Sequence, residues 1–168
     1  ADISALLQQK ITKLQSELEA LEEEKEEKQT EYDKKSAEVE DKTNKLANNI
    51  RDAIKLSQKM SADQEATCKR VVSECVNDYV NGKHPGESLQ QLINKRLTGY
   101  SDTGFNTTKL DSLLSSNQGL GREINSLCND ITNLVSDIKD VTERYNNKNT
   151  VYNTTVNNRN EILAAAQT

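Results

Sequence analysis

The sequence predicts an all-α protein, built as a long antiparallel helical hairpin (a coiled coil) with a small helical cap between its two long helices. The first observation is a stripe in which apolar residues alternate at spacings of four and three. It consists of Leu120, Ile124, Leu127, Ile131, Leu134, Ile138, Val141 and Tyr145. A shorter stripe of the same kind near the N-terminus consists of Leu7, Ile11, Leu14, Leu18 and Leu21. The third observation is composition: 33% of the residues are hydrophobic and 29% are charged, which suits a rod that buries only two positions in seven.

The first segment, residues 1–60, is predicted to be a long coiled-coil helix from about Ile3 to Met60. Its apolar stripe fades in the middle, where the same helical phase is mostly occupied by lysine. That part reads Lys25, Lys28, Tyr32, Lys35, Val39 and Lys42. The surrounding residues 22–40 are dense in Glu and Lys, so we interpret them as an exposed helix rather than as a phosphate or metal site.

The cap, residues 61–107, contains most of the turn signals of the chain. Ser61 and Gln64 have the spacing of a capping box, so a helix is expected over about 62–81. Asn81-Gly82 predicts its end, and Pro85-Gly86 predicts a turn. A short amphipathic helix follows over residues 88–97, and then an irregular stretch over 98–106.

The last segment, residues 108–168, is predicted to be the second long helix, over about 109–165, capped by Thr108 to Asp111. Gly119 and Gly121 are expected either to bend it or to allow close packing. Residues 146–160 are rich in Asn, a weak helix former. Two interpretations therefore stay open, a frayed terminus or a helix that is ordered within an assembly through Tyr145, Tyr152, Val156 and Ile162.

Pairing the two long helices predicts which residues face each other. With the cap between them, residues near 50 face those near 118, residues near 30 face those near 138, and residues near 10 face those near 158. Each apolar stripe then lies against a polar half of the other helix. We therefore expect an isolated hairpin to leave both stripes poorly covered, and we predict that all the stripe residues form an assembly interface.

Few residues are candidates for a catalytic, metal-binding or cofactor-binding role. His84 lies in a Gly/Pro turn with no Cys or carboxylate at ligand spacing and is interpreted as a loop residue. Cys68, Cys75 and Cys128 are interpreted as small buried hydrophobic residues. The chain has no nucleotide-binding or hydrolase motif. We therefore expect no catalytic, metal or cofactor site.

Charge and hydropathy limit the possible partners. The net charge is −5 and the basic residues are interleaved with acidic ones, which disfavours nucleic acid binding. No apolar run is long enough to span a membrane. The first residues, Ala1-Asp-Ile-Ser4, do not resemble a Sec-type signal peptide, so we expect either a signal that has been removed or export by a route that uses none.

One stretch resembles a known family. Residues 124–158, INSLCNDITNLVSDIKDVTERYNNKNTVYNTTVNN, resemble the C-terminal helix of type III secretion needle-tip and extracellular filament proteins, with an "NDI" segment followed by a Tyr-Asn pair and further Asn residues. The resemblance implies that the long helices form a shaft that drives polymerisation and that residues 68–106 form an exposed face. The chain is short for a tip protein and lacks a large middle domain.

The function predicted first is a non-enzymatic structural subunit that self-assembles at a bacterial surface, secreted without a cleavable Sec signal. Its partners would be other copies of the chain, a secretion-needle subunit or an export chaperone. The alternative is a cytosolic coiled-coil adaptor or chaperone-like module that binds a helix of another protein. An enzyme is the least favoured class, because no group of residues combines a nucleophile, a base and an orienting partner.

Overall fold

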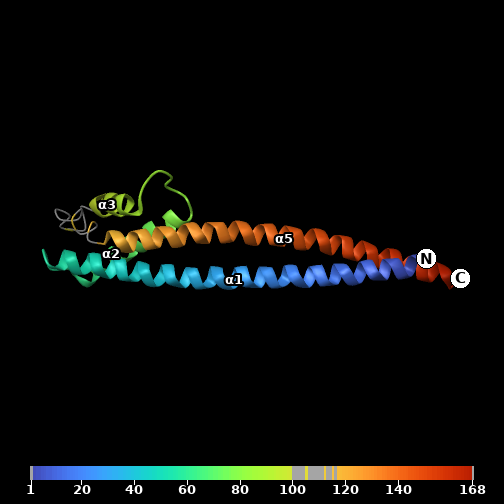
Figure 1. Ribbon diagram of the computed structural model, residues 1–168. Helices are drawn as coiled ribbons and strands as arrows, with labels where there is room; N and C mark the ends of the chain where they lie inside the picture. Colours follow the sequence, from blue (N-terminus) through green and yellow to red (C-terminus); the bar gives the residue numbers. More distant parts are fainter. Residues whose placement is uncertain (1, 100–104, 106–111, 113–114, 116, 168) are drawn as a thin grey trace. The chain divides into compact units, whose positions relative to one another are not determined.

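The structure is a computed structural model that describes residues 2–99, 105, 112, 115 and 117–167. All regular secondary structure in this part of the chain is helical. The predicted all-α class is therefore confirmed. The helices are α1 (Ile3–Lys55), α2 (Ala62–Val80), α3 (Leu89–Gly99) and α5 (Gln118–Ala166), as labelled in Figure 1.

Helix α1 starts where predicted and ends earlier than predicted. The Asp2 carboxylate accepts a hydrogen bond from the Ser4 backbone N–H at 3.0 Å, which satisfies one free donor of the first turn. At the other end the last turn tightens, because the Leu56 N–H donates to the Ala53 carbonyl and the Ser57 N–H to the Ile54 carbonyl. The expected continuation to Met60 is thus wrong: the chain leaves the helix after Lys55.

The predicted capping box of α2 is confirmed. Gln64 N–H donates to Ser61 Oγ at 3.1 Å, and Ser61 N–H donates to Gln64 Oε1 at 2.9 Å. The helix stops after Val80, and Gly82 then adopts a φ of 67°, the left-handed conformation that glycine takes without a steric penalty. The expected Asn81-Gly82 stop is therefore also confirmed.

The connection to α3 contains a tight turn and a second capping box. Gly86 has a φ of 86° and the Glu87 N–H donates to the His84 carbonyl, which is the pattern of a Pro-Gly type II turn. Gln91 N–H donates to Ser88 Oγ at 3.1 Å while Ser88 N–H donates to Gln91 Oε1 at 3.0 Å. This reciprocal cap had not been predicted, and it starts α3 directly after the turn.

Helix α5 is continuous through the Asn-rich segment. Residues 146–160 are helical in the single chain, so the expected frayed terminus is wrong, and ordering of this segment by an assembly stays a prediction. Gly121 allows close packing, since a Cβ there would lie 3.0 Å from Gln90 Nε2, whereas nothing lies within 4 Å of one at Gly119. The predicted cap at Thr108 to Asp111 lies outside the described residues.

The chain divides into two compact units that cut across the three segments expected from sequence. The first unit combines Ala1–Tyr32 with Leu134–Thr168, and the second is Asp33–Asn133. Within the first unit, α1 and α5 run side by side in opposite directions (Figure 1). The second unit is a small helical bundle around a core of fully buried side chains. That core includes Leu46, Ile50, Ile54, Cys68, Val71, Val72, Cys75, Leu89, Leu92, Ile93, Leu97, Ile124 and Cys128.

Candidate functional site

The pairing of α1 with α5 follows the predicted alignment. In the first unit Arg159 donates to Gln8, and Lys28 Nζ lies 3.5 Å from Asp137 Oδ2. In the second unit Asn49 Nδ2 donates to Asn117 Oδ1 at 2.9 Å. Each of these contacts lies within three residues of the alignment expected from sequence, which is therefore confirmed.

Ion pairs between the two helices recur at heptad spacing. Besides Lys28 with Asp137, Lys35 Nζ lies 3.1 Å from Asp130 Oδ2 and Lys42 Nζ lies 2.9 Å from Glu123 Oε2. Each step of seven residues along α1 is matched by a step of seven back along α5. The Lys42–Glu123 hydrogen bond raises the pKa of Lys42 and lowers that of Glu123. We call these three pairs the lysine ladder.

Both apolar stripes are covered within the single chain. Ile124, Leu127, Ile131, Leu134 and Val141 are no more than 9% exposed. On α1 the same holds for Ile11, Leu14, Leu18 and Leu21. Leu7, Leu120, Ile138 and Tyr145 are partly exposed. The expectation that each stripe is poorly covered by its polar partner half is therefore wrong.

The physical reason is that long charged side chains are apolar over most of their length. The lysines of the ladder occupy the phase of the α1 stripe, and their side chains are only 33%, 22% and 33% exposed. Because their ammonium groups reach carboxylates on α5, we infer that their four-carbon stems lie over the seam of leucine and isoleucine. A residue counted as polar in the sequence thus contributes hydrophobic cover.

The N-terminal stripe is covered in a similar way by the polar part of α5. Lys148 pairs with Glu17, and Arg144 Nη2 lies 3.1 Å from Glu24 Oε1. The Tyr152 hydroxyl accepts a hydrogen bond from Gln15 Nε2 at 3.2 Å. Thr155 is only 4% exposed, and its hydroxyl donates to the Val151 carbonyl one turn back, so it enters the interface without an unpaired donor.

Large apolar side chains that stay exposed are concentrated in the first unit. Four of them lie near the chain ends, where α1 begins and α5 finishes: Ile3 (61% exposed), Leu6 (52%), Ile162 (37%) and Leu163 (44%). We call these four residues the terminal patch. Figure 1 shows the N- and C-termini at the same end of this unit. The patch residues therefore lie on both helices near the end of this unit that holds the two termini.

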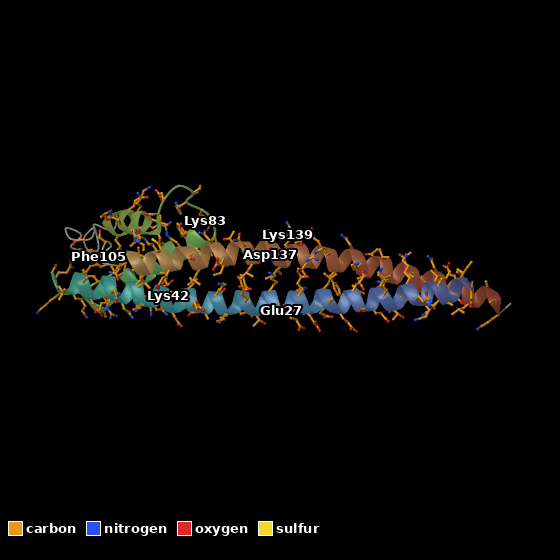
Figure 2. The ribbon with its side chains drawn as sticks, in the orientation of Figure 1. Glu27, Lys42, Lys83, Phe105, Asp137 and Lys139 are labelled. Atoms are coloured by element: carbon orange, nitrogen blue, oxygen red, sulfur yellow. The ribbon has the colours of Figure 1, made fainter. Side chains whose placement is uncertain are left out.

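The charge of the chain is unevenly divided between the units. The first unit carries thirteen acidic and eight basic residues, so its net charge of −5 equals that of the whole chain, and the second unit is neutral. The excess lies in residues 17–31 of α1, which contain eight Glu and two Lys. Figure 2 shows Glu27 on the side of α1 away from α5, whereas Asp137 faces α1. Within this segment Glu17 and Glu24 pair with basic residues of α5, whereas Glu27 is presented to solvent.

A polar cluster lies at the α2–α3 connection, where the sequence predicted only a loop histidine. Arg96 Nη2 donates to Asp78 Oδ2 at 2.5 Å and lies 3.0 Å from His84 Nε2. His84 Nδ1 lies 3.6 Å from Glu87 Oε2, so the histidine does have carboxylate neighbours. The Arg96 hydrogen bond holds the pKa of Asp78 below its usual value. The spacing of three between His84 and Glu87 was a usable sequence signal, but nothing in the sequence linked Asp78 with Arg96.

The three cysteines are buried, as predicted, and all three are free thiols. Burial raises the pKa of Cys68, Cys75 and Cys128 to about 11 in each case. Cys75 Sγ makes a weak hydrogen bond to the Leu92 carbonyl at 3.9 Å, which ties α2 to α3. Thiols in this state are neutral core groups.

Among the described residues no group of three or more His, Cys, Asp or Glu side chains could hold a metal ion. No helix in that part of the chain is long and apolar enough to cross a membrane. Comparisons with protein-family models, with curated proteins and with solved structures found no match. The resemblance to type III secretion proteins therefore stays a prediction.

Proposed function

We propose that this chain is a non-enzymatic structural subunit whose two long helices form an antiparallel coiled-coil hairpin with a small helical cap. The observation that carries the proposal is the lysine ladder, in which heptad steps on α1 match heptad steps on α5. A coiled coil whose seam is closed within one chain is suited to act as a spacer or arm.

The proposed partner is a second copy of the chain, and the proposed contact is the terminal patch rather than the buried stripes. Ile3, Leu6, Ile162 and Leu163 are the apolar side chains that the helix pair leaves exposed at its terminal end. Nine of the thirteen stripe residues first expected at the interface are already buried, so a second copy could reach those nine only if the helix pair opened. Location at a bacterial surface and export without a Sec signal remain predictions of the family resemblance.

Light scattering across a concentration series tests the proposal. We expect oligomers that grow with concentration, and we expect Leu6→Glu combined with Leu163→Glu to abolish them without loss of helical circular dichroism. Val135→Glu is the matched control, because Val135 is 52% exposed on α5 away from the patch. A chain that is monomeric at all concentrations would overturn self-assembly.

The alternative is an adaptor that binds a helix of another protein, and the same experiment separates the two functions. An adaptor would stay monomeric in the concentration series, and its terminal patch would bind a helix of a different protein. Core changes cannot separate them, since Leu127→Asp and Leu134→Asp would unfold the helix pair: both residues are buried within one chain.

A further inference from the structure

A cluster of charged and titratable side chains joins the end of α2, the connection and the C-terminal part of α3, and it has no role in the proposed assembly. Its members are Asp78, Lys83, His84, Glu87, Lys95 and Arg96. Asp78 lies on α2, Lys95 and Arg96 lie on α3, and the other three lie on the connection. His84 contacts groups from all three parts.

The geometry at His84 fits a neutral imidazole. Arg96 Nη2 carries two N–H groups and has no acceptor capacity. One N–H serves Asp78 Oδ2 at 2.5 Å, and His84 Nε2 lies 3.0 Å away as the acceptor for the other. With Nε2 accepting, the ring proton is on Nδ1, which faces Glu87 Oε2 at 3.6 Å. This oxygen is buried and has no hydrogen-bond partner in the described part of the chain.

A charged imidazolium cannot keep this arrangement. Both of its ring nitrogens are donors, so a proton on Nε2 would point at an N–H of Arg96. The nearest acceptors are the carboxylates on either side: Asp78 Oδ2 lies 3.9 Å from Nε2, and Glu87 Oε2 lies next to Nδ1.

The other charged groups around the ring hold those two carboxylates in place. Lys83 Nζ lies 3.7 Å from Asp78 Oδ1, and Lys95 Nζ lies 3.6 Å from Glu87 Oε1. Cys75, on the core side of Arg96, adds no charge while its thiol stays protonated. Protonation therefore exchanges one attractive contact for another rather than simply loosening the cluster.

We propose that His84 is a pH-sensing side chain of the α2–α3 connection. On protonation the ring gives up its hydrogen bond from Arg96 and moves to the carboxylates of Asp78 and Glu87. Histidine is the side chain that ordinarily changes charge between about pH 5 and 8. Lys83 and Lys95 are 62% and 75% exposed, so the surface carrying them changes its shape and charge with pH.

Nuclear magnetic resonance of the full chain between pH 5 and 8 tests the proposal. We expect the Arg96 side-chain N–H and the backbone amides of residues 82–88 to shift with one midpoint, equal to that of the His84 ring. His84→Gln is the matched control, because glutamine can accept from Arg96 and donate to Glu87 but does not titrate. Its Arg96 signals should stay constant over this range.

Two results would overturn the proposal. One is a His84 ring that titrates while the Arg96 and connection signals stay constant, and the other is a pH-dependent shift of the Arg96 signals that persists in His84→Gln. Glu87→Gln provides a second check: losing one carboxylate partner of the charged ring should move the midpoint to lower pH. An unmoved midpoint would contradict the transfer to Glu87.

Discussion

Lys35 Nζ lies 3.1 Å from Asp130 Oδ2 while the lysine side chain is only 22% exposed. We infer that the apolar stem of Lys35 covers the seam of α5 while its ammonium group pairs with a carboxylate of the same helix. Lys28 and Lys42 repeat the arrangement one heptad away on either side.

The first prediction separates the stem of Lys35 from its charge. Lys35→Met keeps an apolar stem and should change the free energy of unfolding by less than about 1 kcal/mol, the usual value of a surface ion pair. Lys35→Ala removes the stem and should cost about 1–2 kcal/mol, at roughly 0.8 kcal/mol per buried methylene. Urea unfolding followed by circular dichroism measures both. Lys34→Ala, at an exposed neighbour, is the control, and equal losses in the Met and Ala variants would show that charge alone matters.

The second prediction concerns the core of the second unit. Leu92 is 1% exposed, so Leu92→Ala should lower the free energy of unfolding by about 2–5 kcal/mol through lost burial and the cavity left behind. Leu56→Ala is the same change at a side chain that is 88% exposed, and it should have an effect within about 0.5 kcal/mol. Thermal or urea unfolding distinguishes them. Similar losses at both sites would mean that Leu56 is covered in solution.

The third prediction is a pH dependence of stability from Asp78. Because the Arg96 hydrogen bond lowers the pKa of this carboxyl in the folded chain, its contribution is fully present above the unfolded pKa, ordinarily about 3.9. It is lost as the pH falls through the folded pKa. The difference in stability between the wild type and Asp78→Asn should therefore shrink as the pH falls below about 4. Urea midpoints measured between pH 5 and pH 3 test this, and a difference that grows as the pH falls from 4 to 3 would contradict it.

The fourth prediction concerns the buried thiols. With a pKa of about 11 for each cysteine, only about one thiol in a thousand is ionised at pH 8, and all three side chains are buried. A disulfide reagent that releases a coloured thiol should therefore react with the folded chain only as it opens. All three thiols should react at once in denaturant. Fast reaction of any cysteine in native buffer would show that the second unit is open there.

Much of the fold could be predicted because its signals are local. Ser61 and Gln64 specify a helix start through their spacing alone, and Gly82 specifies an end because few other residues adopt its φ of 67°. The end of α1 was missed because the residues after Lys55 are compatible with a helix, and no breaker separates them from it. The alignment of α1 with α5 followed from the position of the cap and was confirmed at Gln8–Arg159 and Asn49–Asn117.

The candidate site was less predictable than the fold. Asp78 and Arg96 are eighteen residues apart on different helices, so only the turn at Pro85-Gly86 brings them together around His84. The terminal patch was also missed, since Ile3 and Leu6 lie beside the phase of the stripe rather than in it. Both features depend on how helices are oriented about their axes, which residue spacing along one helix does not report.

By itself, the sequence determined that the chain is helical, where α2 begins and ends and which stretches of the two long helices face each other, because these follow from spacing along the chain. Whether the apolar stripes are covered was decided only by the tertiary structure. In a sequence pattern a lysine counts only as a polar residue, but in the helix pair its apolar stem and its ammonium group occupy different environments. We infer that this separation, as at Lys35 and Asp130, is why most stripe residues are buried within the single chain, while the residues of the terminal patch stay exposed.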